Sequence, residues 1–192
     1  MEAKIICMND EYMLEGCRKN DRNCQRQLYE KYFRPMAWIC YRYVRDREVA
    51  DDLVHEGFVK VFRRIDSFKN EGSFEGWVKR IMINCCLDHL RKGKRRPDEI
   101  SVEGVAEPQS DEHDALADLQ AEYILEKIQE LPTIPRTVFN LNVIEGYPHK
   151  DIAQMMKIKE STSRAYLTEA KQLLRESLKK VVNQTERRLY HG

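Results

Sequence analysis

Chain breakers are scarce in this sequence, with 8 glycines and 6 prolines among 192 residues. Together they make up about 7% of the chain, against roughly 12% in average proteins. Charged residues reach 34% and apolar residues 42%. Because long side chains such as Lys, Arg, Glu and Gln lose little rotamer freedom on a helix, this composition favours helix over strand. The apolar share is large enough to exclude disorder of the whole chain.

Long apolar runs are missing as well. No run approaches the ~20 residues that a helix needs to span a bilayer. The first residues, Met1–Cys7, lack the apolar segment of a signal peptide. We therefore expect a soluble protein that acts in the cytoplasm.

Motifs for covalent chemistry are also lacking: there is no P-loop, G-x-G-x-x-G, H-E-x-x-H or G-x-S-x-G. The six cysteines form no C-x-x-C and fit neither a disulfide framework nor a common zinc site. A thiol or metal enzyme centred on Cys85, Cys86 and His89 is one alternative. Such an enzyme needs further convergent ligands, or a base and an orienting group. We expect reduced cysteines packed as small apolar residues, and no enzyme activity, metal or cofactor.

Charge is strongly segregated along the chain. Five bases lie within residues 91–96, and residues 97–118 then contain eight acids and no Lys or Arg. From residue 157 onward nine bases face four acids. The acidic stretch has little apolar periodicity and cannot bury enough surface to offset chain entropy. The sequence therefore predicts an all-α protein with helical domains at 1–95 and 116–182, a flexible acidic linker at 96–115, and a tail at 183–192 with no motif.

Apolar periodicity and capping side chains predict the elements of the first domain. They are a short helix capped by Asn9 or Asp10, a helix over 28–43 that Pro35 kinks or breaks, a helix from Asp46 to Ile65, a loop over 67–72, and a helix that starts near Ser73. The last helix is apolar on two sides and leaves a narrow strip formed by Trp77, Arg80, Asn84, Asp88 and Arg91. That strip is either a solvated edge with an internal Asp88–Arg91 pair or a basic, aromatic surface for nucleic acid.

The second domain has the pattern of a helix-turn-helix. Helices are expected over 116–131, 135–144, 148–156 and about 160–182, with a turn at 157–159. The final helix carries one apolar face, and its opposite face carries Ser161, Arg164, Ala165, Thr168, Gln172 and Arg175, with Lys171 at the edge. An ordinary amphipathic helix also has a polar outer face. The compact partner helix and tight turn favour DNA recognition, because small residues allow close approach and Arg bonds guanine or phosphate.

Four segments, in order and spacing, resemble the extracytoplasmic-function (group four) sigma factors, initiation subunits of bacterial RNA polymerase. They are Leu28–Tyr32, similar to L-Y-x-x-Y; Asp46–Phe62, similar to D-x-x-x-A-E-D-L-V-Q-E-x-F; Phe74–Arg91, similar to F-x-x-W-L-x-x-I-A-x-N-x-x-x-D-x-x-R; and the pieces of the fourth conserved region between Leu131 and Thr162. The resemblance covers nearly the whole chain.

The resemblance implies roles and partners. Asp51, Asp52, His55 and Glu56 stand where such factors hold the clamp helices of the largest polymerase subunit. The loop 67–73, with Lys69 and Asn70, and the strip residues Trp77, Arg80, Asn84 and Arg91 stand where the melted promoter is captured. In the final helix, Ser161, Arg164, Ala165 and Thr168 are expected to contact base edges, and Lys159, Lys171 and Arg175 phosphates. The implied partners are core RNA polymerase (clamp helices and flap), promoter DNA and an anti-sigma factor.

Some residues depart from the family pattern. His55 replaces the usual Gln and keeps a hydrogen-bonding group, which introduces pH sensitivity. Pro148 and Lys159 replace capping Ser or Thr residues, and Ala165-Tyr166 replaces a more common Ser-Arg. These departures concern the promoter sequence rather than the family. A second interpretation is a free-standing helix-turn-helix regulator with an N-terminal sensing domain, which would bind palindromic DNA as a dimer.

Overall fold

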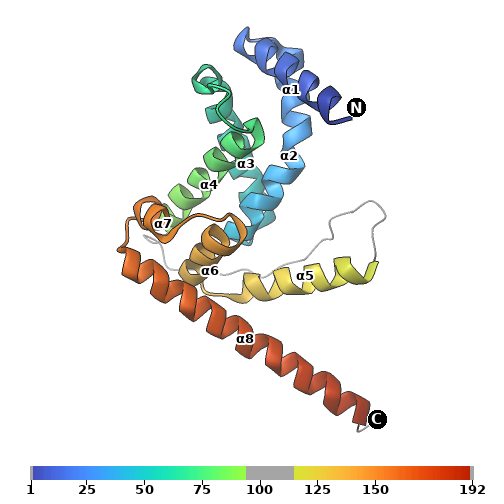
Figure 1. The fold of residues 1–192 in the computed structure, drawn as a ribbon, viewed down its shortest axis with the longest axis vertical. Helices are drawn as coiled ribbons and strands as arrows, with labels where there is room; N and C mark the ends of the chain where they lie inside the picture. The colour runs from blue at the N-terminus through green and yellow to red at the C-terminus, as the bar shows by residue number, and fades with distance from the viewer. Residues whose placement is uncertain (1, 94–114, 191–192) are drawn as a thin grey trace. The chain divides into compact units, whose positions relative to one another are not determined.

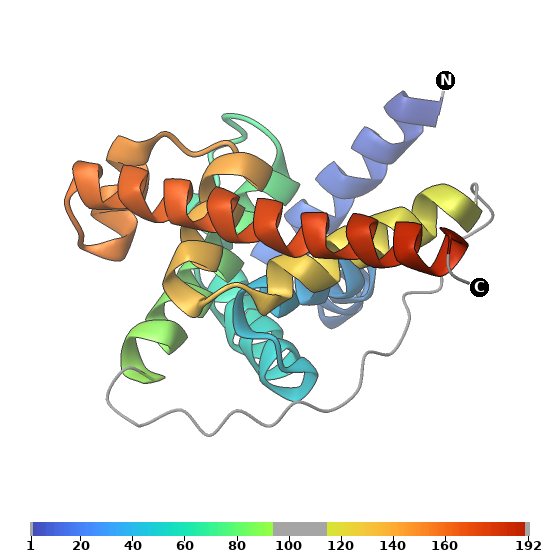
Figure 2. The same cartoon turned by 90° about the horizontal axis from the view of Figure 1, so that it is seen from below.

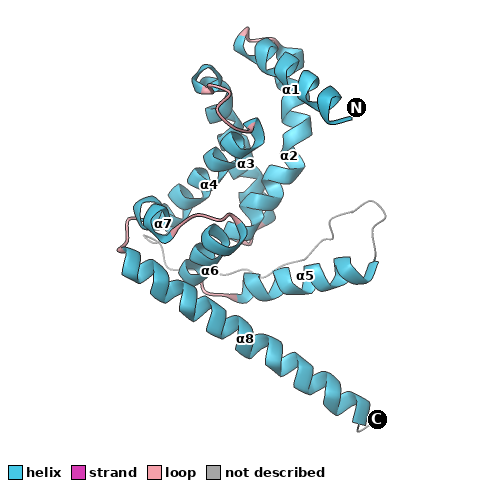
Figure 3. Ribbon diagram, in the orientation of Figure 1, coloured by secondary structure: helices cyan, strands magenta, loops and turns pink. Residues whose placement is uncertain are grey.

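The computed structural model describes the backbone of residues 2–93 and 115–190, and side chains of residues 10–93 and 123–179. Every regular element in the described residues is helical (Figure 3), which confirms the all-α prediction. The chain divides into two compact units, residues 1–96 and 97–192, which are treated separately below. The predicted linker at 96–115 lies, except for its last residue, outside the described residues.

The N-terminal unit is a helical bundle organised around one long helix (Figure 1). Its elements are α1 (Glu2–Arg18), α2 (Arg22–Val44), α3 (Arg47–Arg63), the short 3-10 helix η1 (Ile65–Ser67) and α4 (Phe74–Gly93). Helix α2 packs against α1, α3 and α4, and α3 and α4 also pack against each other. The largest side chains fully buried among these helices include Leu28, Met36, Tyr43, Val54, Phe58, Met82 and Ile83.

The start of α1 differs from the sequence-based prediction. The expected cap at Asn9 or Asp10 is wrong, because α1 begins at Glu2 and both residues lie inside it. Asp10 instead binds two side chains of α2: it forms an ion pair with Lys31 and accepts a hydrogen bond of 3.2 Å from the Tyr32 hydroxyl. A tertiary contact has therefore replaced the local cap.

Helix α2 runs without a break from Arg22 to Val44, although Pro35 lies inside it. Of the two predicted alternatives, a kink or a break at Pro35, the break does not occur. The proline ring is exposed, while Tyr32, Met36 and Ile39 around it are buried. Burial of both halves against neighbouring helices offsets the backbone hydrogen bond that proline removes.

Helix α3 begins and packs as its sequence predicts. The Asp46 carboxylate accepts a hydrogen bond of 3.0 Å from the Val49 N–H and caps the helix. The helix ends at Arg63, and Ile65 lies in the short 3-10 helix that follows. In its middle, Gly57 allows close approach of α4, since a Cβ there would lie 2.1 Å from Met82 Sδ.

Helix α4 is buried on two sides, as its apolar pattern predicts. It begins at Phe74, and the Ser73 hydroxyl accepts a 3.0 Å hydrogen bond from the Gly76 N–H. Its buried residues are Phe74, Val78, Ile81, Met82, Ile83, Cys85, Cys86 and Leu87. Of the predicted strip, Arg80, Asn84 and Arg91 are exposed, and Trp77 and Asp88 are part-buried. Asp88 and Arg91 also form the predicted internal ion pair.

The C-terminal unit packs three helices against the long α8. Its elements are α5 (Ala115–Glu130), α6 (Thr133–Phe139), the π-helical segment η2 (Asn140–Ile144), α7 (His149–Met156) and α8 (Glu160–Tyr190). Figures 1 and 2 show α6 and α7 against the N-terminal half of α8. The end of α5 reaches α8 through Glu130, whose Oε2 accepts a 3.4 Å hydrogen bond from the Ser177 hydroxyl. The buried Arg136 joins α6 to α5, because its Nη1 donates to the Gln129 carbonyl at 3.0 Å.

Three details of this unit differ from the sequence-based expectation. The helix expected over 135–144 begins at Thr133 and ends in a π-helical turn. Pro135 is therefore the third residue of the helix, a position where a backbone N–H has no intrahelical partner, so proline removes no hydrogen bond there. Pro148 precedes α7 as its cap residue instead of opening the helix. Helix α8 continues past Val182 to Tyr190, in a stretch that contains neither Gly nor Pro.

The turn between α7 and α8 is present as predicted at 157–159. Lys157 adopts the left-handed conformation, with φ of 56°, and ends α7. The Ile158 N–H then donates to the Ala153 carbonyl at 3.0 Å, which satisfies a carbonyl of the last turn of α7. Among the helices in the described part of the chain, none is both long and apolar enough to cross a membrane.

The cap at Asp46 yields a stability prediction. Asp46→Ala should lower the free energy of unfolding of the N-terminal unit by about 1 kcal/mol, because the Val49 N–H loses its acceptor. Asp46→Asn keeps a side-chain oxygen at the same place and should retain most of that stability. Urea unfolding followed by circular dichroism measures both variants. Equal losses in the two variants would contradict the capping role.

Candidate functional site

An acidic face lies along the exposed side of α3. Asp52, His55, Glu56 and Val59 follow the i, i+3, i+4, i+7 spacing that places residues on one side of a helix, and all four are exposed. Asp51, also predicted for this site, is half-buried beside them. Val59 is 48% exposed and was not singled out from the sequence, although its spacing from Asp52 could have identified it. The face therefore combines carboxylates with an apolar contact point.

His55 is held in place by aromatic residues of α2. Its Nδ1 lies 3.1 Å from the Tyr29 hydroxyl, and the two rings stack with centroids 5.8 Å apart. The Phe33 ring lies at the same centroid distance on a tilted plane. Burial, together with the nearby Asp51 carboxylate, raises the pKa of Tyr29, so the phenol remains neutral. His55 thus presents a fixed ring to the surface.

Glu56 is oriented by a lysine one turn further along α3. Lys60 Nζ lies 2.7 Å from Glu56 Oε1 and also donates to Cys85 Sγ of α4 at 3.2 Å. The hydrogen bond from Lys60 lowers the pKa of Glu56, and the same bond raises the pKa of Lys60. Both groups are therefore charged at neutral pH, and the carboxylate of Glu56 keeps a defined direction.

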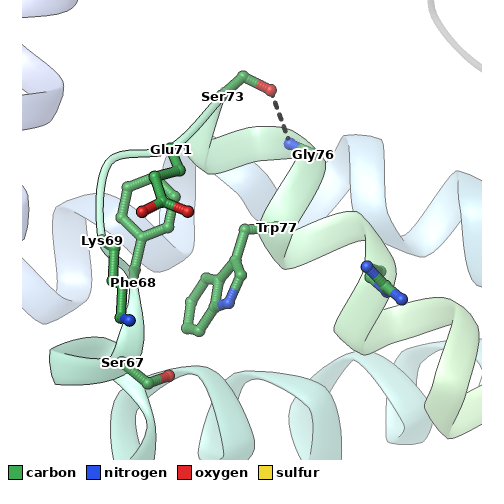
Figure 4. Close-up of a pocket in the computed structure, with 8 residues that line it drawn as sticks. Ser67, Phe68, Lys69, Glu71, Ser73, Gly76 and Trp77 are labelled. Atoms are coloured by element: carbon green, nitrogen blue, oxygen red, sulfur yellow. Dashed lines mark hydrogen bonds between the residues drawn. The ribbon is translucent and has the colours of Figure 1, made fainter.

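A second candidate site is a cavity of about 380 Å³ at the start of α4 (Figure 4). Its lining consists of Ser67, Phe68, Lys69, Glu71, Ser73, Gly76, Trp77 and Arg80. Figure 4 shows the Trp77 indole projecting from α4 toward the loop that carries Phe68 and Lys69. The cavity thus joins an aromatic wall to cationic and hydroxyl groups.

The aromatic wall consists of three rings that pack on one another. The centroids of Phe68, Phe74 and Trp77 lie 5.3–5.7 Å apart. Arg18 of α1 anchors the loop that carries Phe68, since its Nη2 donates a hydrogen bond to the Phe68 carbonyl at 2.9 Å. Gly72, with φ of 103°, permits the turn into α4. The half-buried Trp77 thus has fixed neighbours on its inner side.

The structure brings some of the predicted DNA-melting residues together and separates others. Lys69, Trp77 and Arg80 line the same cavity. Asn70 occupies a left-handed position in the loop outside the lining, and Asn84 and Arg91 lie further along the exposed strip of α4. Sequence reasoning did not single out Phe68 or Glu71 within the loop, although both line the cavity.

A third candidate site is the exposed face of α8. The described positions Lys159, Ser161, Arg164, Ala165, Thr168, Lys171 and Arg175 are all exposed. On the opposite face Ser163, Leu167 and Ala170 are buried. The predicted division of this helix into a packed face and an open polar face is therefore confirmed.

Arg164 is tied to its own helix in the free protein. Its Nη2 lies 2.6 Å from Glu160 Oε1, and the Thr168 hydroxyl donates to the Arg164 carbonyl at 3.1 Å. Both members of the ion pair are exposed, so the pair is weak and readily exchanged. Sequence reasoning missed a second contact of α8, which joins it to α7: His149 Nδ1 lies 2.9 Å from the Ser163 hydroxyl.

The cysteine cluster does not form a reactive site. Cys85 and Cys86 are buried, whereas His89 is exposed. Burial raises the pKa of Cys85, and a hydrogen bond with Cys40, together with burial, raises that of Cys86. Such thiols stay protonated, the opposite of what a nucleophile needs. Cys17, Cys24 and Cys40 are likewise buried and free, and the described residues contain no group of metal-binding side chains.

Comparison with known proteins matches both units to one family. Residues 28–96 match Sigma-70 region 2, and residues 121–174 match Sigma-70, region 4. The chain is 27% identical over 186 residues to the RNA polymerase sigma-H factor of Pseudomonas aeruginosa, covering 91% of this chain and 96% of that protein. It is 26% identical over 178 residues to the ECF RNA polymerase sigma-E factor of Haemophilus influenzae, covering 87% and 94%.

Two solved structures share the fold. One is CnrH in complex with the cytosolic domain of CnrY, with a TM-score of 0.50, 18% identity and coverage of 90% of this chain and 98% of that one. The other is the sigma factor RpoE in complex with the anti-sigma factor NepR from Bartonella quintana, with a TM-score of 0.55, 22% identity and coverage of 80% and 96%. With regions 2 and 4 in order and relatives matched over nearly their full length, the chain belongs to the ECF sigma factors, which direct RNA polymerase to promoters.

Proposed function

We propose that this sigma factor docks on core polymerase through the acidic face of α3, captures melted promoter DNA in the cavity beside Trp77, and reads the upstream promoter element with α8. A sigma factor binds core polymerase and DNA and performs no covalent chemistry itself. In this proposal, residues 1–95 dock on the polymerase and melt the promoter, and residues 116–182 recognise the upstream element. The acidic linker at 96–115 would connect the two within the polymerase. We infer that the protein acts in the cytoplasm, where transcription takes place.

The arrangement of the acidic face supports docking on the clamp helices of the largest subunit. Asp52 and Glu56 present two carboxylates on one side of α3, and Val59 adds an apolar contact on the same side. The ion pair with Lys60 holds Glu56, and stacking on Tyr29 holds His55, before the polymerase binds. Preorganised side chains lose less conformational entropy when a partner binds.

The cavity supports capture of an unpaired base. Taking a base out of the duplex costs a few kcal/mol, which stacking on an aromatic ring and contacts to the backbone offset. Trp77 supplies the ring, while Lys69 and Arg80 supply positive charge at the same opening. Asn84 and Arg91 continue the polar strip along α4, where they would track the strand.

The open face of α8 supports recognition of the upstream element. Ser161, Ala165 and Thr168 are small and permit the helix to approach base edges closely. Arg164 would exchange Glu160 for guanine or a phosphate, and Lys159, Lys171 and Arg175 would contact phosphates. The flap of the polymerase is the proposed docking point of this domain. We also propose an anti-sigma partner, by analogy with the NepR complex of the similar Bartonella protein.

The acidic face can be tested by mutation. Asp52→Ala and Glu56→Ala should weaken binding to core polymerase. Transcription from every promoter should then fall, because the factor must bind the polymerase before it can contact any promoter DNA. Fluorescence titration of labelled protein with core polymerase, together with run-off transcription on a genomic library, measures both effects. Glu15→Ala removes an exposed carboxylate of α1 and serves as the control. Normal core binding by both variants would refute the assignment.

Mutations in α8 should separate base contacts from phosphate contacts. Arg164→Ala should cost about 1–3 kcal/mol of binding on the preferred upstream element if the residue reads a base, and little on other sequences. Lys171→Ala should instead weaken all sequences alike and reduce the salt slope by about 1. Holoenzyme binding to promoter fragments at several salt concentrations measures both. If Arg164→Ala weakens binding to all sequences equally, Arg164 contacts a phosphate and not a base.

The Glu56–Lys60 pair generates a pH prediction. Lys60→Met should raise the pKa of Glu56 toward its ordinary value, because the hydrogen bond that lowers it is removed. In the wild type, the contribution of Glu56 to stability is present above its unfolded pKa and is lost as pH falls through its lower folded pKa. Carboxyl NMR titration of Glu56 in both proteins measures the shift. Lys69→Met, on the cavity loop, should leave the titration of Glu56 unchanged.

A further inference from the structure

A basic and aromatic stretch in the C-terminal half of α2 belongs to none of the three candidate sites. Residues 31–45 contain four bases and no acid. Positions 34, 38, 41 and 45 follow the i, i+4, i+7, i+11 spacing that places residues on one side of a helix. This side, called the α2 stripe below, consists of Arg34, Trp38, Tyr41 and the cap residue Arg45. The stripe thus places two aromatic rings between two arginines.

The two rings of the α2 stripe pack on each other. The centroids of Trp38 and Tyr41 lie 6.0 Å apart and their planes differ by 26°, which is a stacked arrangement. Both side chains are part-buried, so they are held against the helix and keep part of their surface toward solvent. The bases of a single nucleic-acid strand stack on aromatic surfaces of this kind.

The arginines at the two ends of the α2 stripe are exposed. Neither guanidinium has a hydrogen-bond or ion-pair partner among the side chains that the structure describes, whereas Arg26, earlier in the same helix, pairs with Glu30. Arg34 and Arg45 are eleven positions apart, or about 16 Å at the helical rise, a distance that about five stacked nucleotides span at roughly 3.4 Å each. Both charges are therefore open to a strand of phosphates.

Three features favour single-stranded DNA over other anionic ligands. A duplex presents phosphates to arginines but keeps the faces of its bases stacked inside, away from an aromatic pair. A partner helix needs apolar anchors, and none of the large exposed apolar side chains in the described residues belongs to α2. The chain belongs to a family that directs RNA polymerase to promoters, and an opened promoter supplies single-stranded DNA.

We propose that the α2 stripe is a second binding surface for single-stranded promoter DNA, separate from the cavity beside Trp77. Trp38 stacks on a base, and Tyr41 supports the indole ring. Arg34 and Arg45 contact phosphates on either side of that base. Because every base has an aromatic face and every nucleotide a phosphate, the stripe adds affinity for the opened strand without reading its sequence. The inference goes beyond the proposed capture at the cavity and does not require it.

The test uses holoenzyme reconstituted from the full chain and core polymerase. One probe is fork-junction DNA, made from a promoter found by run-off transcription, with a single-stranded tail that contains 5-iodouracil. A matched probe lacks the tail. Fluorescence anisotropy at several salt concentrations gives the dissociation constants, and ultraviolet light links iodouracil to aromatic side chains in contact with it. The affinity of each variant for core polymerase is measured separately.

Loss of the ring at position 38 should weaken binding of the tailed probe. Trp38→Leu keeps an apolar side chain but removes stacking, so the dissociation constant should rise by about five- to 150-fold, whereas Trp38→Phe should keep most of the affinity. Arg34→Gln combined with Arg45→Gln should reduce the salt slope by about 1.4, since each phosphate contact with a single strand contributes roughly 0.7. In the wild type, crosslinked peptides should include Trp38 or Tyr41.

Two exposed residues outside the α2 stripe serve as matched controls. Tyr12→Leu removes an exposed ring from α1, and Arg26→Gln removes a base from the N-terminal half of α2. Both variants should bind the tailed and untailed probes as the wild type does. Because Arg34 and Arg45 are exposed, their variants test the stripe even if Trp38→Leu disturbs the packing of α2.

Three results would overturn the inference. They are unchanged affinity for the tailed probe in the Trp38 and arginine variants, crosslinks that never include the α2 stripe, and a loss of affinity for core polymerase in the same variants, which would identify the stripe as a protein contact. The proposed capture is tested separately by Trp77→Ala. If that variant binds the tailed probe normally while the stripe variants do not, the capture proposal fails and the inference about the stripe stands.

Discussion

Burial of α4 on two sides is the constraint on which the N-terminal unit depends. The helix packs against both α2 and α3, and Gly57 lets α3 come close enough to contact Met82. Two buried faces leave one narrow exposed strip, so few positions of α4 can meet a ligand. Trp77 and Arg80 occupy the start of that strip, where the loop from η1 closes the cavity. The same packing that stabilises the helix therefore limits which side chains of α4 stay exposed.

The exposed functional groups are held by neighbours from other helices. His55 of α3 stacks on Tyr29 of α2, and Lys60 connects Glu56 to Cys85 of α4. In the C-terminal unit, a hydrogen bond between His149 and Ser163 joins α7 to α8. Side chains that are held in this way lose less conformational entropy when a partner binds.

Much of the helical pattern could be predicted from local signals. The cap at Asp46, the helix start near Ser73 and the turn at 157–159 depend on neighbouring residues, and the structure contains all three. The misplaced start of α1 and the supposed break at Pro35 share a cause. In both places, contacts between helices overrode a local preference, since Asp10 binds α2 and the buried faces around Pro35 hold α2 together. Similarly, Phe68 and Glu71 belong to a loop, where no periodicity shows which side chains face a cavity.

The sequence by itself determined the family, the all-helical class and which face of α8 is polar, because motif spacing and the 3.6-residue period are properties of the chain alone. Only the tertiary structure decided which side chains meet. It brought the loop from η1 against the start of α4, so that Phe68 packs on Trp77 and Glu71 shares a cavity with Arg80. It also brought Lys60 between Glu56 and Cys85. These pairings depend on how helices pack against one another, and side chains far apart in the sequence leave no local signal of such a contact.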